Sequence, residues 1–421
     1  MTAFQRIVSA LGVSGVLAVS LSAQTGPNFA FIFSHEDIRT SYLANAVIWR
    51  DPGPLTPAQI KAGPPAAIPD AIRRGSDGEV IDCTYERPGN QLGGATEKFS
   101  CRTPDGKSVR IKYYDGHKGN REVFAEVAAT RLMWALGFDA DPMFSLTVNC
   151  LQCPEDPQTG QGARQTRRYP AAYEPHYVGT IITSTKDPEQ GWRFGELEKA
   201  IGTLPAGPLR VRQRTQFDAL SLLAVFIQHG DRKHSQQRLV CRGAIDLTKG
   251  DFHDVQPGDS SSFRLPVLFE HENERACVGE SVVTIQDVGA TFGGAGMFTR
   301  RTAAKINLKE WSGNEIWGTR SSGKNGGGSD CITHMTVSGS SGSEANENPR
   351  ISEAGRAFLL EQLKRLTPDH VRAIFEAAHV DQVGDNYQWT DESTGKSYTG
   401  TDAWVAAFLD KVKQIEERHC S

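Results

Sequence analysis

A polar loop between two apolar segments is the part of this chain whose residue types and spacing suggest chemistry. The loop spans residues 228–238, after the apolar helical pattern of residues 217–227 and before the short apolar strand 239–241, and it carries Asp231 and Lys233. Catalytic groups concentrate on loops that rigid elements hold in place. An aspartate that accepts a proton, beside a cation, suits phosphoryl transfer to a hydroxyl. The structural alternative for Asp231 is an aspartate that caps a turn.

Phosphoryl transfer also needs a lysine for the phosphates and a carboxylate that holds this lysine. Lys112 lies in the predicted strand 109–114, and Glu122 and Glu126 lie one turn apart in the predicted helix 122–136, which Gly137 ends. A lysine inside a sheet needs a partner that offsets its loss of hydration. We expect Glu126 to be this partner, with Glu122 as the alternative. The other interpretation of Lys112 is an edge-strand lysine that points to solvent.

Three further positions complete a set of groups that would bind a nucleotide and a metal. Gly93 and Gly94 lie in a glycine-rich hairpin loop, where the missing Cβ lets backbone N–H groups approach phosphate, and Lys98 follows them. Asp287 ends an apolar strand and is a predicted Mg²⁺ ligand. Gln236 offers a side-chain carbonyl oxygen for a second metal ion. A plain hairpin turn is the alternative for the two glycines.

The secondary-structure elements that must position these residues are predicted to be mainly strands in the first part of the chain and mainly helices in the second. Alternating apolar residues predict a β-rich part at 79–183, in which residues 150–169 form a polar loop, and helical patterns dominate 184–421. The fold class is therefore α+β. Predicted strands lie at 80–85, 98–102, 109–114, 144–148, 176–183 and 239–241, and residues 282–292 are predicted to be a strand that runs into a glycine-punctuated loop. Predicted helices lie at 122–136, 217–227, 352–366, 368–378 and 402–418. Residues 24–78 are predicted to be an extension of short helices, 243–281 an insertion, and 320–349 a flexible Gly/Ser/Asn-rich segment.

The N-terminus and the cysteines both indicate export. Residues 1–23 have the short basic start and apolar stretch of a signal peptide, with an uncleaved anchor as the alternative. The even number of cysteines, 8, permits disulfides in an oxidising compartment. Cysteine positions suggest the pairs Cys83–Cys101, Cys241–Cys277 and Cys150–Cys153, the last of which has a redox or zinc motif as its alternative. We expect a periplasmic or extracellular protein without a stable membrane span after cleavage.

Composition narrows the possible partners. The chain of 421 residues has 38% hydrophobic and 23% charged residues, which excludes wholesale disorder and a protein with many membrane spans. A net charge of -4 gives no reason to expect nucleic-acid binding. The expected partners are a nucleotide and a protein or small-molecule acceptor.

Short motifs in the chain resemble those of atypical protein-kinase-like phosphotransferases. Gly230-Asp-Arg-Lys-His-Ser-Gln236 is similar to the Gly-Asp-Arg-His-x-x-Asn loop of phosphoinositide kinases, and Asp287-Val-Gly289 is similar to their Asp-Phe-Gly. Glu126-Val-Ala-Ala-Thr-Arg-Leu with Trp134-Ala-Leu-Gly-Phe138 is similar to a helix of HipA-like and secretory-pathway kinases. The resemblance spans roughly residues 80–380.

This resemblance implies a bilobal fold, with a β-rich N-lobe at 79–183 and a mainly helical C-lobe at 184–421, and ATP with Mg²⁺ or Mn²⁺ as cofactors. It assigns Asp231, Lys112 and Lys233 to catalysis, and Gly93, Gly94, Lys98, Lys112 and Glu126 to the nucleotide. Asp287 and Gln236 become metal ligands. Gln236 stands where the family has Asn, no GxGxxG is present, and the insertion is long. A pseudokinase that acts as a binding module and an enzyme that transfers the nucleotidyl group therefore remain alternatives.

Overall fold

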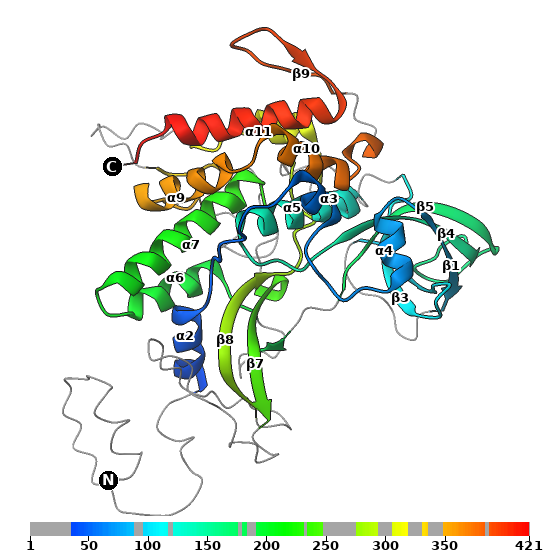
Figure 1. Ribbon diagram of the computed structural model, residues 1–421, viewed down its shortest axis with the longest axis horizontal. Helices are drawn as coiled ribbons and strands as arrows, with labels where there is room; N and C mark the ends of the chain where they lie inside the picture. The colour runs from blue at the N-terminus through cyan, green and yellow to red at the C-terminus, as the bar shows by residue number, and fades with distance from the viewer. Residues whose placement is uncertain are drawn as a thin grey trace, which may run out of the picture. The chain divides into compact units, whose positions relative to one another are not determined.

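The computed structural model describes most of the unit His35–Ser421. The described residues are 35–87, 96–116, 121–175, 179–182, 191–230, 234–246, 275–293, 305–318, 331–335, 348–383 and 387–420. The expected signal peptide at 1–23 lies outside them. Within the described residues, strands and helices mix in an α+β fold (Figure 1).

The strands are β1 (Val80–Glu86), β2 (Lys98–Arg102), β3 (Ser108–Tyr113), β4 (Phe144–Cys153), β5 (Gln165–Tyr173), β6 (Thr180–Ile181), β7 (Gln237–Asp246), β8 (Arg275–Ile285), β9 (Trp389–Thr390) and β10 (Ser397–Tyr398). The helices are α2 (His35–Asn45), α3 (Pro57–Ala62), α4 (Asp70–Ser76), α5 (Glu122–Leu136), α6 (Phe194–Thr203), α7 (Pro208–Phe226), α8 (Leu308–Gly313), α9 (Glu353–Lys364), α10 (Pro368–Ala377) and α11 (Gly400–Glu417), with short 3-10 turns η3 (His234–Gln236) and η7 (Val380–Val383). None of the helices in this described part is long and apolar enough to cross a membrane.

Strands β1, β2, β3, β5 and β4 form a closed barrel in that order (Figure 1). Antiparallel pairs join the neighbours, and the parallel pair of β1 with β4 closes the barrel. Side chains that alternate along each strand fill the interior, among them Phe99, Ile111, Tyr113 and Val148. Because alternation sends every second residue to the other face, Lys112 lies on the outside of the barrel, between the buried Ile111 and Tyr113.

Helix α5 carries the two glutamates that the sequence singles out. It begins at Glu122 and ends at Leu136, where Gly137 adopts the left-handed conformation of a C-cap, as predicted. It packs against β4, β5, α3 and α10, and nearly all of its side chains are buried. The barrel and the helical elements therefore hold α5 from several sides, which fixes the direction in which its glutamates point.

Strands β6, β7 and β8 form a second sheet in that order. The antiparallel pair of β7 and β8 places Gln237 opposite Ile285, so the polar loop before β7 and the loop after β8 lie at the same end of this sheet. Of the insertion predicted at 243–281, the ends belong to these two strands, and residues 247–274 lie outside the described part.

The C-terminal helices enclose the largest apolar core. Helix α7 packs against α6 and α9, and α11 packs against α8, α9 and α10. Aromatic rings of Phe292, Trp311, Phe375 and Trp404 lie in mutual contact at its centre. Phe292 lies a few residues after Asp287, so the C-terminal end of the loop that carries Asp287 is anchored in this core.

Disulfides join Cys83 to Cys101, Cys150 to Cys153 and Cys241 to Cys277, which are the pairs that the sequence suggests. A further disulfide joins Cys331 to Cys420. No cysteine in the described part is free, which removes the zinc alternative for the Cys150 motif. A redox motif of this spacing forms the same disulfide when it is oxidised. Cys331 belongs to the segment 320–349, whose described residues 331–335 are held by this disulfide and by backbone hydrogen bonds.

Several predicted element boundaries are wrong. The short strand predicted at 239–241 is the longer β7, and the strand predicted to begin at 282 is β8, which begins at Arg275. The predicted polar loop 150–169 contains the end of β4 and the first half of β5, which the sequence conceals because the first four residues of β5 (Gln165 to Arg168) bury little. The helix predicted at 217–227 begins at Pro208, because its first turns are polar and face solvent. Arg214 lies in those turns and forms ion pairs with Glu198 and Asp218.

Candidate active site

An ion pair on the outside of the barrel is the centre of the candidate site. The Nζ of Lys112 donates a hydrogen bond to Oε1 of Glu126 at 2.6 Å, and Glu174 Oε2 lies 3.7 Å from the same nitrogen. The Lys112 side chain is 12% exposed and that of Glu126 is 1% exposed. Glu126 is therefore the partner of Lys112, and the alternatives of Glu122 as partner and of a solvent-facing lysine are wrong.

The charges around Lys112 keep it protonated. Burial by itself lowers the pKa of this ammonium, but the carboxylates of Glu126, Asp287 and Glu174 outweigh burial and raise the pKa above its ordinary value. Lys112 is thus a permanent positive charge at the physiological range of pH. Such a charge can hold phosphate oxygens, but it cannot act as a base.

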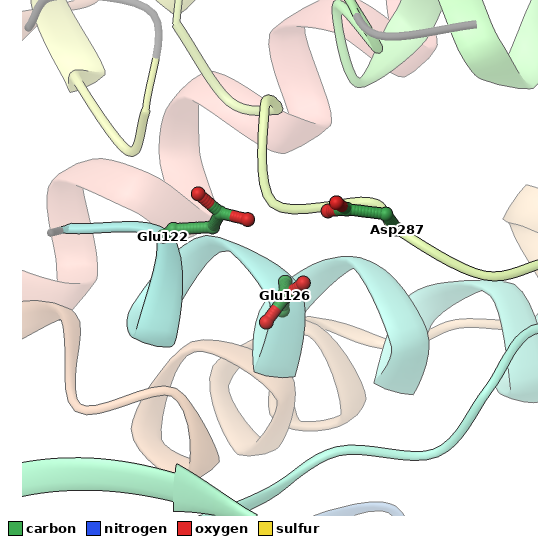
Figure 2. Close-up of side chains that lie close together, drawn as sticks. All are labelled: Glu122, Glu126 and Asp287. Atoms are coloured by element: carbon green, nitrogen blue, oxygen red, sulfur yellow. The ribbon is translucent and has the colours of Figure 1, made fainter. Parts of the chain in front are cut away.

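Three carboxylates meet next to this lysine. Glu122 and Glu126 extend from successive turns of α5, and Asp287 reaches toward them from the loop after β8 (Figure 2). One oxygen from each lies within 4.8 Å of the others. The spacing of four residues puts both glutamates on one face of the helix. Carboxylate oxygens at this separation are suitable ligands for a hard cation such as Mg²⁺ or Mn²⁺.

The protonation of the three carboxyl groups differs. Burial raises the pKa of Asp287, but the Lys112 ammonium outweighs it and brings this pKa to about 2. Burial raises the pKa of Glu126 well above its ordinary value, and burial together with Asp287 raises that of Glu122. Oε2 of Glu126 is buried and has no hydrogen-bond partner. The cluster therefore lacks positive charge, which a proton or a metal ion can supply.

Glu122 connects three parts of the chain. Its Oε2 accepts hydrogen bonds from Thr96 Oγ1, just after the glycine-rich loop, and from Lys305 Nζ. Its side chain also fills the space beside Gly289, where a Cβ would overlap Glu122. Gly289 is thus required by packing against Glu122, since its backbone does not adopt a positive φ.

Residues 231–233, with Asp231 and Lys233, lie outside the described residues, as do Gly93 and Gly94. The chain on both sides of 231–233 is bonded to the Asp287 loop. Gly230 N donates to Ala290 O at 2.9 Å, and Gln286 N donates to Gln236 O at 2.9 Å. The two segments that the sequence marked as catalytic loop and metal loop are therefore neighbours, although they are far apart along the chain.

A pocket of about 640 Å³ brings the described candidates together. Lys98, Lys112, Gln236 and Asp287 all line it. Sequence reasoning missed other residues of its wall, among them Asp141, Glu174, Arg110 and Arg238. For one of them, Arg110, the sequence does contain a signal. Strand alternation places Arg110 on the same face as Lys112.

Comparison with known proteins adds little. No family model matches the chain, and no curated protein matches it either. One similar solved structure is a Helicobacter pylori proinflammatory kinase, CtkA, with 10% sequence identity and a TM-score of 0.36. The match covers 81% of this chain and 95% of that chain. A likeness at this level carries no argument about activity, so function must be argued from the side chains of the pocket.

Proposed function

We propose that the protein is an exported, ATP-dependent phosphotransferase that moves the γ-phosphoryl group to a hydroxyl of a protein or small molecule. The observation that carries this proposal is the ion pair of Lys112 with the buried Glu126, together with the place of Lys112 and Asp287 in the wall of one pocket. Phosphoryl transfer requires positioning and positive charge more than covalent chemistry. A lysine held by a buried carboxylate, next to a metal-binding aspartate, supplies both.

The roles of the remaining residues follow from their place around this pair. Lys112 and Lys98, which are directly opposite each other on β3 and β2, would contact phosphate oxygens. Asp231 would accept the proton of the acceptor hydroxyl, and Lys233 would stabilise the transferring group. The hydrogen bonds that tie both flanks of 231–233 to the Asp287 loop support this role. In this proposal the barrel belongs to the N-lobe of a bilobal kinase-like fold.

A divalent cation fits the carboxylate cluster. Asp287 stays ionised because of Lys112, and the buried Glu126 Oε2 without a hydrogen-bond partner points to a missing positive charge. Asp287 would hold Mg²⁺ or Mn²⁺, and Gln236, which lines the same pocket, would offer its carbonyl oxygen to a second ion. The bound ion would neutralise charge on the phosphates. Glu122 or Glu126 can replace Gln236 in this role, since their oxygens are within reach of Asp287.

Export is supported by the disulfides. All of the cysteines are paired, and reducing compartments rarely maintain such bonds. We place the protein in the periplasm or outside the cell, after cleavage of the N-terminal segment. A pseudokinase or a nucleotidyl transferase on the same fold is the second candidate, because Gln236 occupies the position at which the family has Asn.

Calorimetry with ATP and Mn²⁺, followed by a phosphoryl-transfer assay, tests the proposal. We expect the wild type to bind ATP only with the metal. Asp287→Ala should lose metal-dependent binding and lower transfer by about a thousandfold or more, which is the scale of lost electrostatic stabilisation. Asp402→Asn, on the exposed start of α11 and paired with Arg372, is the matched control and should behave as the wild type.

Three outcomes decide against the proposal. If the oxidised wild type binds no nucleotide with either Mg²⁺ or Mn²⁺, the phosphotransferase is excluded. If ATP binds and Asp231→Ala leaves the biological function intact, the protein is a binding module. A mass increase of the acceptor by AMP instead of phosphate identifies the nucleotidyl transferase.

A further inference from the structure

The outer face of β2 and β3 forms one wall of the pocket and is polar along its whole length. Lys98, Ser100, Ser108, Arg110 and Lys112 all line the pocket. They alternate with residues that fill the barrel, so their side chains share one face. The register sets Lys98 opposite Lys112 and Ser100 opposite Arg110. Three cations and two hydroxyls thus lie on two paired strands.

Positive charge on this face is only partly balanced. Lys112 is bound by Glu126 and lies near Glu174. Among the described residues, no carboxylate forms an ion pair with Lys98 or Arg110. Like charges that are directly opposite in a sheet are unfavourable. Burial and the Lys112 charge lower the pKa of Lys98, and the carboxylates of Asp287, Glu122 and Glu126 offset this only in part. The structure therefore holds two neighbouring cations at a cost in free energy, and a bound anion would lower this cost.

The chemical groups of the wall also indicate which kind of ligand it would bind. Pockets for flat apolar groups are lined mainly by hydrophobic side chains. Here the apolar lining residues are Tyr173 and Pro175 at the β5 side of the pocket and Val109 on β3, whereas the other β2–β3 lining residues offer ammonium, guanidinium and hydroxyl groups. Such donors match phosphate oxygens, and arginine binds them with two parallel N–H groups. Arg110 lies two residues before Lys112 on the same face of β3, so this site adjoins the Lys112–Glu126 pair.

We propose that Lys98, Ser100, Ser108 and Arg110 form an oxyanion subsite that binds a phosphate group, beside the Asp287 cluster in the same pocket. The inference rests on the proposed function, because it assigns the substrate chemistry of the same pocket. The phosphate has two possible sources, the nucleotide itself and an acceptor that already carries a phosphate. A basic strand face that merely interacts with water is the competing account.

Pyrophosphate is the probe, titrated by calorimetry into the full oxidised protein without nucleotide or metal. We expect the wild type to bind it, and Arg110→Gln and Lys98→Gln each to weaken binding by about tenfold or more, because hydrogen bonds to charged groups are worth more than neutral ones. Arg102→Gln is the matched control, since Arg102 lies on the same strand but is paired with Glu86. It should leave the affinity unchanged.

Equal affinity in Arg110→Gln and the wild type, or an equal loss in Arg102→Gln, would overturn the subsite. Circular dichroism and the unfolding midpoint show whether each variant is folded. For a variant that fails to fold, Arg110→Lys replaces it, which retains the charge and should lose only the paired N–H geometry.

A second titration finds the source of the phosphate. The protein is first saturated with a non-hydrolysable ATP analogue and Mn²⁺. Pyrophosphate that still binds in an Arg110-dependent way indicates a phosphate on the acceptor, and pyrophosphate that is excluded indicates a phosphate of the nucleotide. Both results retain the subsite. If Asp287→Ala binds pyrophosphate normally and the wild type binds no nucleotide, the phosphotransferase fails and the subsite remains.

Discussion

Strand β3 has two faces, and the regions that meet it are stabilised in opposite ways. On the inner face, Ile111 and Tyr113 pack with Phe99 in an apolar interior. On the outer face, Lys112 meets the acidic cluster of α5 and Asp287. The inner face gains stability from burial of apolar surface. The outer face buries charges, which cost free energy even when they are paired.

This difference indicates what each region is for. Two disulfides, Cys83–Cys101 and Cys150–Cys153, further stabilise the barrel interior. The outer cluster retains Glu126, whose second oxygen has no hydrogen-bond partner, although an apolar pair of similar size would often be as stable. We interpret the barrel as a support and the cluster as the functional centre. Substitutions on the two faces of β3 should therefore separate stability from activity.

Substitution of Lys112 should have the largest effect. Lys112→Ala leaves Glu126 buried without its cation, so we expect the free energy of unfolding to fall by about 3–5 kcal/mol and transfer to be lost. The loss should be larger at pH 8 than at pH 5, because the raised pKa of Glu126 lets it take up a proton as the pH falls. Urea unfolding at the two values of pH measures it.

The double variant Lys112→Met with Glu126→Leu is the control. It removes both charges and should return the stability close to that of the wild type while activity stays absent. A double variant that is as unstable as Lys112→Ala would show that the pair supports the fold, and the contrast between the two faces would then be lost.

Removal of the Cys83–Cys101 disulfide should lower the stability of the protein and leave its nucleotide affinity unchanged. The Cys83–Cys101 bond closes a loop with a sequence separation of 18, so Cys83→Ala with Cys101→Ala should lower the free energy of unfolding by about 3 kcal/mol. Nucleotide affinity at 25 °C should be unchanged, because the bond lies inside the barrel. Denaturant unfolding and calorimetry on the same sample test both statements.

Cys150→Ala with Cys153→Ala is the matched variant. Its bond closes a separation of only 3, so the loss should be smaller, about 1.5 kcal/mol. A fall in nucleotide affinity that accompanies either pair would mean that the barrel interior positions the site more directly than we infer.

Whether a feature depends on local or on distant residues explains which parts of the fold the sequence predicts. Strand alternation and helix caps are local, so β2, the range of α5 and its Gly137 cap follow from the sequence directly. Closure of the barrel by the parallel pair of β1 with β4 is not local, and nothing in either strand specifies its partner. Strand β5 was missed because its polar first half carries no alternation of buried residues.

The candidate site likewise has one part that the sequence predicts and another part that it does not. The Lys112–Glu126 pair was predictable because a strand lysine next to a helix with two glutamates has few partners to choose from. The contact of Glu122 with Lys305 joins residues 183 apart in sequence, and the contact with Thr96 crosses from the glycine-rich loop. No sequence pattern predicts either of these contacts. The pocket wall that includes Asp141 requires the folded chain as well.

Asp141 should give an effect that depends on pH. It is 3% exposed, and burial, with the charges of Glu174 and Asp139, raises its pKa to about 8. The folded state therefore binds a proton that the unfolded state has released between about pH 4 and 8. This contribution to stability is complete below pH 4 and is lost as the pH rises through the folded pKa.

Asp141→Asn removes this titration. We expect the variant to be more stable than the wild type at pH 8, by on the order of 2 kcal/mol after allowance for relaxation and water entry, and equally stable at pH 4. Urea unfolding across this range measures the difference. Asp82→Asn, on the exposed face of β1, is the control and should show no such trend. A constant offset for Asp141→Asn at every pH would contradict the prediction.

Gly289 gives the smallest effect and the sharpest test of the outer cluster. A Cβ at this position would overlap Glu122, so Gly289→Ala should displace the glutamate and cost about 1–2 kcal/mol. Nucleotide affinity should fall with it if Glu122 positions the Asp287 loop. Glu122→Ala in the same chain vacates the space, so the double variant should regain the stability that Gly289→Ala loses. If the double variant recovers stability but not affinity, Glu122 acts on the nucleotide or its metal through its carboxylate. If it recovers both, Glu122 only fills space, and the functional part of the cluster is limited to Lys112, Glu126 and Asp287.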